Sequence, residues 1–319
     1  MAKIAYPGSM RPNARDVVGN IDLSAKTAIV TGATSGLGIE TARALAAGGC
    51  TVVLAVRDTA RGEVVAVDIR AYTGNVRVSV LPLDLTDLAS VRAFAPAFGA
   101  DRRLDILVNN AAIMANPLTY TADGYESQFA TNHLGHFLLT VSLLPNLLQQ
   151  GGRVVAVSSI GHARSDIHFE DIHYRARDYD PWGAYGQSKT ANSLFAVELT
   201  RRYAGQGLTA NAVMPGGIMT GLQKHMSQDE IRARGWVDEN GVQNPRFKTV
   251  EQGAATSVWA AVGPELDGIG GLYLEDCQAA EPWRAEAPYA GYMPHAVSPE
   301  TAERLWGVSE EMVGLRPQR

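Results

Sequence analysis

Short apolar, β-branched runs alternate along the chain with longer segments of helical periodicity. The apolar runs cover 27–30, 51–56, 76–81, 104–109, 153–158, 208–214 and 271–275. The helical patterns cover 36–48, 59–72, 86–98, 122–149, 185–204, 249–263 and 299–314. Apolar strands separated by helices are typical of a parallel sheet that is covered on both faces. The pattern therefore predicts an α/β fold: a Rossmann-type doubly wound parallel sheet of about seven strands in three α/β/α layers.

No internal repeat, low-complexity tract or linker divides the 319 residues. We expect a short N-terminal arm over 1–22 and a single domain over 23–319. Two polar stretches, 160–184 and 217–248, interrupt the alternation after the carboxyl ends of strands, where doubly wound sheets bind ligands. We expect 160–184 to shape a substrate entrance and 217–248 to form a lid.

The charge and cysteine content exclude several classes of protein. The net charge is −5 without a basic stripe, which argues against nucleic acid or an anionic membrane surface as partner. The two cysteines have no metal-like spacing, and the first twenty residues lack the apolar core of a secretory signal. No stretch approaches the ~18 apolar residues of a membrane span. We expect a cytoplasmic protein whose partner is a small molecule.

A glycine-rich turn, "TGATSGLGIE", follows the first predicted strand and leads into a helix. Glycines at such a turn let a phosphate approach the backbone N–H groups and the positive end of the helix dipole. The spacing is G-x-x-x-G-x-G rather than G-x-G-x-x-G. The position of the turn between a strand and a helix nevertheless favours dinucleotide binding over a turn that binds no ligand. The predicted contacts are Gly32, Thr34, Ser35, Gly36, Leu37 and Gly38.

The second predicted strand ends in "LAVRD". NAD sites often carry an acidic residue here for the ribose 2′-hydroxyl, whereas an arginine can hold a 2′-phosphate. Arg57, with its planar fork of donors, favours NADP(H) over NAD(H). The adjacent Asp58 leaves NAD(H) open, and Arg57 as a solvated loop charge is the alternative.

The stretch "YGQSK" places Tyr185 and Lys189 one turn apart on the same face of a predicted helix. In isolation this pair is compatible with a packed phenol and a lysine that reaches water. Five histidines, at 133, 136, 162, 168 and 173, raise the possibility of a metal, but their spacing matches no usual zinc pattern. We expect no metal site. Trp182, Tyr179 and Tyr174 are candidates either for lining a substrate cleft or for anchoring the surface.

Six motifs occur in order over about 24–275: "TGATSGLG", "NNAA", "TNHLGHF", "VSSIGH", "YGQSK" and "MPGGIMT". With them the chain resembles a classical short-chain dehydrogenase/reductase. "LAVRD", "SSIGH" and the long gap before Tyr185 look closest to the branch that contains retinol dehydrogenases and WW-domain oxidoreductases.

The resemblance implies a catalytic group of Asn132, Ser159, Tyr185 and Lys189, with Ser159 chosen over Ser158 because relatives with two serines use the second. It also implies cofactor contacts from Asp84, Leu85, Asn110, Ala111, Ala112, Tyr185, Lys189, Pro215, Gly216, Ile218 and Thr220. Two features depart from the family pattern. Ala112 stands where glycine is usual, and the interval between Ser159 and Tyr185 is unusually long.

Carbonyl reduction needs a hydride and a proton, and an acid/base with a pKa near the working pH delivers the proton best. Free tyrosine titrates near 10, so a pKa near 7 requires about 4 kcal/mol. An ammonium ~4.5 Å away at an effective dielectric constant of ~20 supplies about 3.7 kcal/mol. We therefore predict that Lys189 lowers the pKa of Tyr185. Ser159 would hold the substrate oxygen, and the resemblance gives Asn132 a water in the proton relay.

The predicted function is an NADP(H)-dependent oxidoreductase that acts on a carbonyl or alcohol of a bulky, mostly apolar substrate. One alternative is an enzyme like protochlorophyllide reductase, which shares the glycine turn and Y-x-x-x-K. The other is a non-catalytic NADP-binding scaffold or redox sensor, which the presence of all four catalytic positions disfavours. The substrate, the direction of reaction and a possible homo-oligomer stay open.

Overall fold

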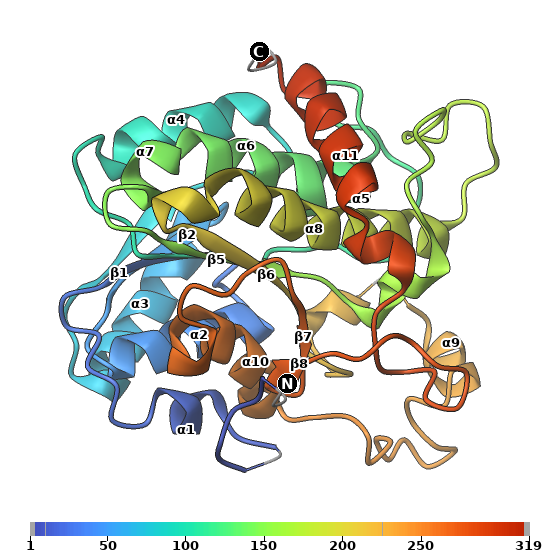
Figure 1. The fold of residues 1–319 in the computed structure, drawn as a ribbon. Helices are drawn as coiled ribbons and strands as arrows, with labels where there is room; N and C mark the ends of the chain where they lie inside the picture. The colour runs from blue at the N-terminus through green and yellow to red at the C-terminus, as the bar shows by residue number, and fades with distance from the viewer. Residues whose placement is uncertain (1–3, 10, 225, 316–319) are drawn as a thin grey trace.

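A computed structural model describes residues 4–9, 11–224 and 226–315. Its centre is a sheet with the strand order β3-β2-β1-β4-β5-β6-β7-β8 (Figure 1). All neighbouring strands run parallel except β7 and β8, which are antiparallel. The strands are β1 (Thr27–Thr31), β2 (Thr51–Val56), β3 (Val78–Pro82), β4 (Ile106–Asn109), β5 (Arg153–Val157), β6 (Thr209–Met214), β7 (Tyr273–Glu275) and β8 (Gln278–Ala279). The predicted doubly wound sheet is confirmed.

Helices cover both faces of the sheet (Figure 1). One layer contains α1 (Ala14–Val18), α2 (Gly36–Ala47), α3 (Thr59–Thr73) and α10 (Val250–Val262), packed around the fully buried Trp259. The other contains α4 (Leu88–Phe98), α5 (Ser127–Phe129), α6 (Gly135–Ser142), α7 (Leu144–Leu147), α8 (Pro181–Tyr203) and α11 (Pro299–Met312). Trp306 of α11 stacks on Phe195 of α8 at 5.9 Å between ring centres. No helix of the described chain has the length and apolar character to cross a membrane.

The topology creates a crevice at one edge of the sheet. β1 pairs with β2 on one side and with β4 on the other, so the chain leaves β1 and β4 toward opposite halves of the sheet. Ligands of doubly wound sheets bind at the carboxyl ends of strands beside such a reversal. The segments after β1, β4, β5 and β6 therefore meet at a common place.

The single helix predicted over 122–149 is wrong. The segment contains α5, a π-helical turn over Ala130–Leu134, then α6 and α7, with an interruption at Leu143. Pro145 sits in the first turn of α7, where a missing N–H is tolerated and continuation from α6 is not. The π turn contains Asn132, in keeping with the frequent occurrence of such turns at functional sites.

The helix that carries Tyr185 begins earlier than predicted. Asp180 caps it by accepting a hydrogen bond from the N–H of Trp182, and Pro181 occupies its first position. Tyr185 consequently lies in the second turn of α8 and not at its start. The sequence pattern also missed α1, the strand β8 and the short helix α9 (Gln228–Ala233).

The described part of the N-terminal arm packs against the domain. Ala14, Val17 and Val18 of α1 are buried against α10 and α2. Farther toward the N-terminus, Ala5 forms an antiparallel bridge with Gln278, and the N–H of Tyr6 donates to the carbonyl of Cys277 at 2.8 Å. The arm thus covers the edge of β8, which would otherwise present unpaired backbone groups.

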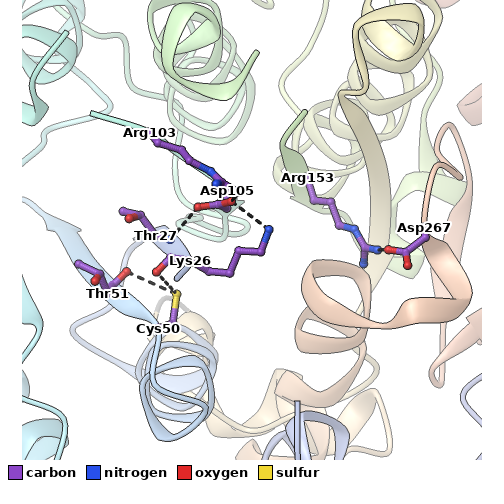
Figure 2. Close-up of polar contacts among 8 residues, drawn as sticks. All are labelled: Lys26, Thr27, Cys50, Thr51, Arg103, Asp105, Arg153 and Asp267. Atoms are coloured by element: carbon purple, nitrogen blue, oxygen red, sulfur yellow. Dashed lines mark hydrogen bonds and ion pairs between the residues drawn. The ribbon is translucent and has the colours of Figure 1, made fainter. Parts of the chain in front are cut away.

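The buried carboxylate of Asp105 holds the amino ends of the central strands together, at the end of the sheet opposite the crevice (Figure 2). It accepts hydrogen bonds from the Lys26 ammonium at 3.1 Å and the Thr27 N–H at 2.9 Å, and it pairs with Arg103. The carboxylate thereby ties the start of β1 to the start of β4. Figure 2 also shows the pair of Arg153 with Asp267, whose carboxylate side chain is 76% exposed.

Replacement of Asp105 by alanine should lower the free energy of unfolding by about 3 kcal/mol, because it leaves a buried set of donors without their acceptor. Asp267→Ala is the matched control and should cost less than about 1 kcal/mol, since its carboxylate is solvated. Urea unfolding followed by circular dichroism measures both. Equal losses in the two variants would contradict the assignment.

Candidate active site

A cavity of about 1500 Å³ opens at the carboxyl ends of the strands. Of the residues predicted to contact a cofactor, the following line it: Gly32, Thr34, Ser35, Gly36, Leu37, Arg57, Asp84, Leu85, Asn110, Ala111, Ala112, Tyr185, Lys189, Pro215, Gly216, Ile218 and Thr220. Ser159 also lines it. Gly38 and Asn132 are absent from the wall, and both have roles behind it.

The glycine turn is shaped by close packing. Gly32 adopts a φ of +66°, and a Cβ there would lie 2.8 Å from the Cα of Ala111. A Cβ on Gly38 would lie 2.6 Å from the carbonyl oxygen of Gly32 and 2.7 Å from Nδ2 of Asn110. Gly38 therefore allows α2 to approach β1 and does not form the wall itself.

The start of α2 is fitted to receive a phosphate. Its N-cap, Ser35, makes no side-chain hydrogen bond to the first turn. The first N–H groups of a helix have no partner within it, and together with the dipole they attract anions. Because Ser35, Gly36 and Leu37 line the cavity, this anion-binding end of the helix meets the cavity wall. The residues present fit the diphosphate of a dinucleotide.

The end of β2 carries two cations on the cavity wall, Arg57 and Arg61. Asp58, which left NAD(H) open in the sequence, caps α3: its Oδ1 accepts from the N–H of Arg61 at 3.0 Å. The carboxylate therefore has a structural role at the helix N-terminus. Arg61 was missed from the sequence, because only the first turn of α3 brings it back beside Arg57.

A buried hydrogen-bonded chain starts at Thr31, the last residue of β1. Its hydroxyl oxygen accepts from the N–H groups of Asn110 and Ala111 at 2.9 and 3.0 Å and lies 2.8 Å from Nε2 of His136. The other ring nitrogen, Nδ1, lies 3.0 Å from the carbonyl oxygen of Asn132 and donates to it. Burial lowers the pKa of His136 to about 4, so the ring is neutral and Nε2 accepts from the threonine hydroxyl.

Asn132 itself lies behind the wall, fully buried in the π turn. Its Oδ1 accepts from the N–H of Ile113 at 2.9 Å, and its Nδ2 donates to the carbonyl of Ile113 at 3.0 Å and to Oγ of Ser188 at 2.9 Å. The side chain clamps the segment after β4 against α8. Asn132 thus positions the elements that carry the other catalytic candidates.

Tyr185 and Lys189 are both buried on the cavity side of α8. The Lys189 ammonium donates to the carbonyl of Val157 at 2.9 Å and lies 5.6 Å from the ring centre of Tyr185. One residue, Ser158, separates Ser159 from the end of β5; the Ser159 hydroxyl accepts from the N–H of Gly161 at 3.0 Å and interacts with the Tyr185 phenol. The neighbouring Ser158 instead donates to the carbonyl of Lys189 at 2.8 Å, so the two serines have different partners.

The prediction that Lys189 brings the pKa of Tyr185 toward 7 is wrong for the polypeptide alone. Burial raises the pKa of Tyr185 to about 12, and the hydrogen bond from Ser159 opposes this only in part. Burial also lowers the pKa of Lys189 to about 7. The buried ammonium is not a permanent charge, and desolvation opposes the charged form of both groups.

The segment 217–248 covers part of the cavity and docks on the start of α8. Trp182 donates from Nε1 to Oε1 of Glu230 on α9 at 3.0 Å, and its ring lies 6.3 Å from the ring of Tyr185. Of the three aromatic candidates, only Trp182 lines the cavity. Tyr179 instead bonds Gln128 at 2.9 Å, and Tyr174 packs against it, so these two anchor the 160–184 segment.

The histidines have separate partners. His133 contacts Ser309 at 2.8 Å, His162 contacts the carbonyl of Ser159 at 2.7 Å, and His173 accepts from the N–H of Glu126 at 3.2 Å. Within residues 4–9, 11–224 and 226–315, no three His, Cys, Asp or Glu side chains are grouped so that they could hold a metal ion.

Lys189→Met should make the protein more stable at pH 7 than the wild type, and the difference should shrink as the pH rises toward 10. The folded-state pKa of about 7 lies below the ordinary value of 10.5, so the unfolded chain binds more protons over this range. The unfolding free energy of the wild type therefore increases as the pH rises, and the methionine variant lacks this increase. Urea unfolding at pH 7, 8.5 and 10, with the exposed Lys224→Met as control, tests this. A difference independent of pH would contradict it.

Comparisons with known proteins agree with this geometry. A family model described as short chain dehydrogenase matches residues 26–231. The chain is 48% identical over 291 residues to a Streptomyces lividans protein named "Probable oxidoreductase", covering 90% of this chain and 97% of that one. It is 42% identical over 299 residues to retinol dehydrogenase 12 of Homo sapiens, covering 93% and 89%. An uncharacterised protein from Mycobacterium Paratuberculosis has a similar structure, with a TM-score of 0.72, 37% identity and coverage of 95% and 98%.

Proposed function

The chain belongs to the short-chain dehydrogenase/reductase family, and on that premise we propose that it is an NADP(H)-dependent carbonyl reductase or alcohol dehydrogenase. The observation that carries the proposal is one cavity with two functional walls. One wall is the glycine turn and the start of α2; the other holds the phenol of Tyr185, the ammonium of Lys189 and the hydroxyl of Ser159. A hydride donor and a proton donor can therefore reach one substrate carbon and oxygen.

The residues that would hold NADP(H) are those of the first wall, the segments after β3 and β4, and the loop 215–220 after β6. When bound, NADPH supplies the hydride. The polypeptide supplies the geometry: Thr31 fixes the segment after β4 through the N–H groups of Asn110 and Ala111, and Asn132 clamps Ile113 beside it. These contacts fix one side of the cavity relative to α8.

The phenol of Tyr185 is protonated at neutral pH, because its pKa is raised to about 12. It is thus an acid that can give its proton to the oxygen of a carbonyl as negative charge develops there. Ser159 bonds the phenol and is placed to hold that oxygen. Lys189, with a pKa of about 7, carries a positive charge in part of the molecules near neutrality and favours loss of the phenolic proton. This arrangement favours reduction as the direction in which the resting protonation state is ready.

We assign the substrate as bulky and mostly apolar. The entrance is lined by Trp182, Trp236 and Phe247, with Met114 and Ile113 on the opposite segment. Apolar and aromatic walls with a few placed polar groups are usual for sites of small organic ligands. That one relative is named a retinol dehydrogenase supports the same class of substrate.

Tyr185→Phe should abolish turnover, by about a thousandfold or more, while NADPH still binds, because only the proton donor is lost. Oxidation of NADPH at 340 nm with a panel of aldehydes and ketones measures turnover, and NADPH fluorescence measures binding. Tyr72→Phe, at an exposed position of α3, is the control and should keep full activity. Full activity in Tyr185→Phe would exclude the assigned mechanism. NADPH binding without turnover of any compound by the wild type would favour the scaffold or sensor.

Arg57→Gln and Arg61→Gln should each weaken NADPH binding about tenfold and leave NADH binding unchanged, because only NADPH carries the 2′-phosphate. Fluorescence titration with both cofactors measures this. Arg232→Gln on α9, which does not line the cavity, should change neither affinity. Tighter binding of NADH than NADPH by the wild type would refute the cofactor preference.

A further inference from the structure

We propose that the substrate end of the cavity contains a subsite for a carboxylate or a similar small anion carried by the substrate. The preferred substrate would then join an apolar, planar body to an anionic group at a distance from its carbonyl. The subsite is formed by a cationic rim, defined as Arg164, Arg234 and Arg246, all of which line the cavity. The inference rests on the proposed function, because it concerns the substrate of that site.

The position of Arg164 relative to the phenol carries the first step. Arg164 ends the 3₁₀ turn Ile160–Arg164 that follows Ser159. Its guanidinium carbon lies 5.6 Å from the ring centre of Trp182, and that ring centre lies 6.3 Å from the ring centre of Tyr185. A substrate whose carbonyl meets Tyr185 and whose body follows Trp182 would bring its far end to Arg164.

The lid supplies the other two cations. The guanidinium of Arg234 lies 3.9 Å from the ring centre of Trp182, and that of Arg246 lies 5.2 Å from the ring centre of Tyr289. Arg246 is adjacent in the chain to Phe247, whose ring lies 5.7 Å from that of Trp236. Arg234 donates from Nε and Nη2 to Oε1 of Glu230, whereas a stacked guanidinium without such a partner, as at Arg246, keeps its edge donors free for an oxyanion.

Two of the three arginines of the rim have no carboxylate partner among the described residues. Oε1 of Glu230 accepts from Nε1 of Trp182 and pairs with the third arginine, Arg234, at 3.0 Å. Among the residues that the structure describes, no carboxylate forms an ion pair with Arg164 or Arg246 within 4.0 Å. The chain as a whole has a net charge of −5, so this positive rim runs against its overall composition.

Another carboxylate of the cavity wall, Asp276, has a partner of its own. Asp276 pairs with the Lys248 ammonium at 2.5 Å, and the same ammonium donates to the carbonyl of Pro215 at 2.9 Å. The pair neutralises both groups and fixes the loop after β6. Arg164 and Arg246, which have no such partner, attract ligands of negative charge, and the planar forks of arginine match a carboxylate.

The test compares two substrates with the same biphenyl aldehyde body and a charged or an uncharged end: 4′-formylbiphenyl-4-carboxylate and its methyl ester, each reduced by the full-length protein with NADPH. We expect kcat/KM for the carboxylate to exceed that for the ester by about tenfold at low ionic strength, with a smaller ratio in high salt. Arg164→Gln and Arg246→Gln should each lower kcat/KM for the carboxylate and leave kcat/KM for the ester unchanged, so that the ratio falls. Arg232→Gln, which pairs with Asp229 on the same lid outside the cavity, should leave the ratio unchanged.

The outcomes separate the subsite from the proposed function. Equal or better reduction of the ester by the wild type overturns the subsite and leaves the oxidoreductase assignment intact. An unchanged ratio in both arginine variants overturns the assignment of these side chains. If neither compound nor any other carbonyl compound of the panel oxidises NADPH, the proposed function fails, and the subsite fails with it.

A binding measurement checks the subsite independently of turnover. Biphenyl-4-carboxylate should quench tryptophan fluorescence of Tyr185→Phe at lower concentration than biphenyl-4-carboxamide, because Trp182 and Trp236 line the cavity. Arg164→Gln in that background should remove the difference. Equal affinity for the acid and the amide would overturn the subsite even if the enzyme reduces carbonyl compounds.

Discussion

The site depends on one costly constraint, the burial of the Lys189 ammonium beside the Tyr185 phenol. Only 1% of Lys189 is exposed, and its polar partner in the described chain is the carbonyl of Val157 at the end of β5. Desolvation of this kind opposes the charged form of both groups and moves their pKa values in opposite directions. Large shifts in a cleft are characteristic of functional sites, where stability is given up for reactivity. The sheet must supply enough packing energy elsewhere to keep α8 in place.

Two polar links, one at each end of the central strands, hold β1 and β4 together. At their amino ends, away from the cavity, Asp105 joins the two strands through charged and backbone donors. At their carboxyl ends, beside the cavity, the hydroxyl of Thr31 joins the same two strands, and neutral His136 extends the link to the π turn. The first link uses charged groups, and the second uses none.

Cations are distributed between two ends of one cavity. Arg57 and Arg61 lie where β2 ends, and the cationic rim lies where the lid meets α8. The cavity wall also carries glycine, aliphatic and aromatic residues and the polar side chains of Asp84, Asn110, Ser159 and Lys189. In a protein of net negative charge, such an arrangement favours ligands with two separated anionic groups or a complex of two anionic ligands. The Glu230 and Trp182 contact holds the rim on the lid against α8, so the lid contributes charge as well as cover.

The sequence by itself determined the order of strands and helices; it also proposed, partly through the family resemblance, a set of cofactor contacts of which all but Gly38 line the cavity. The reason is that these depend on local signals: β-branched runs, glycines that pack closely at the first turn, and a tyrosine and lysine one helical turn apart. Local rules failed at 122–149, where the π turn over Ala130–Leu134 and the position of Pro145 after the interruption at Leu143 divide a helix that the periodicity favours. They also left Asp58 ambiguous until its role as the cap of α3 was visible.

Only the tertiary structure decided the protonation states and the convergence of distant side chains. The pKa of Tyr185 moves upward because long-range packing removes water from it, and no spacing in the sequence measures that burial. Arg164 and Arg246 line one cavity although 81 residues that include α8 and β6 separate them. Proximity of this kind follows from how the lid folds back over the sheet, and not from periodicity along the chain.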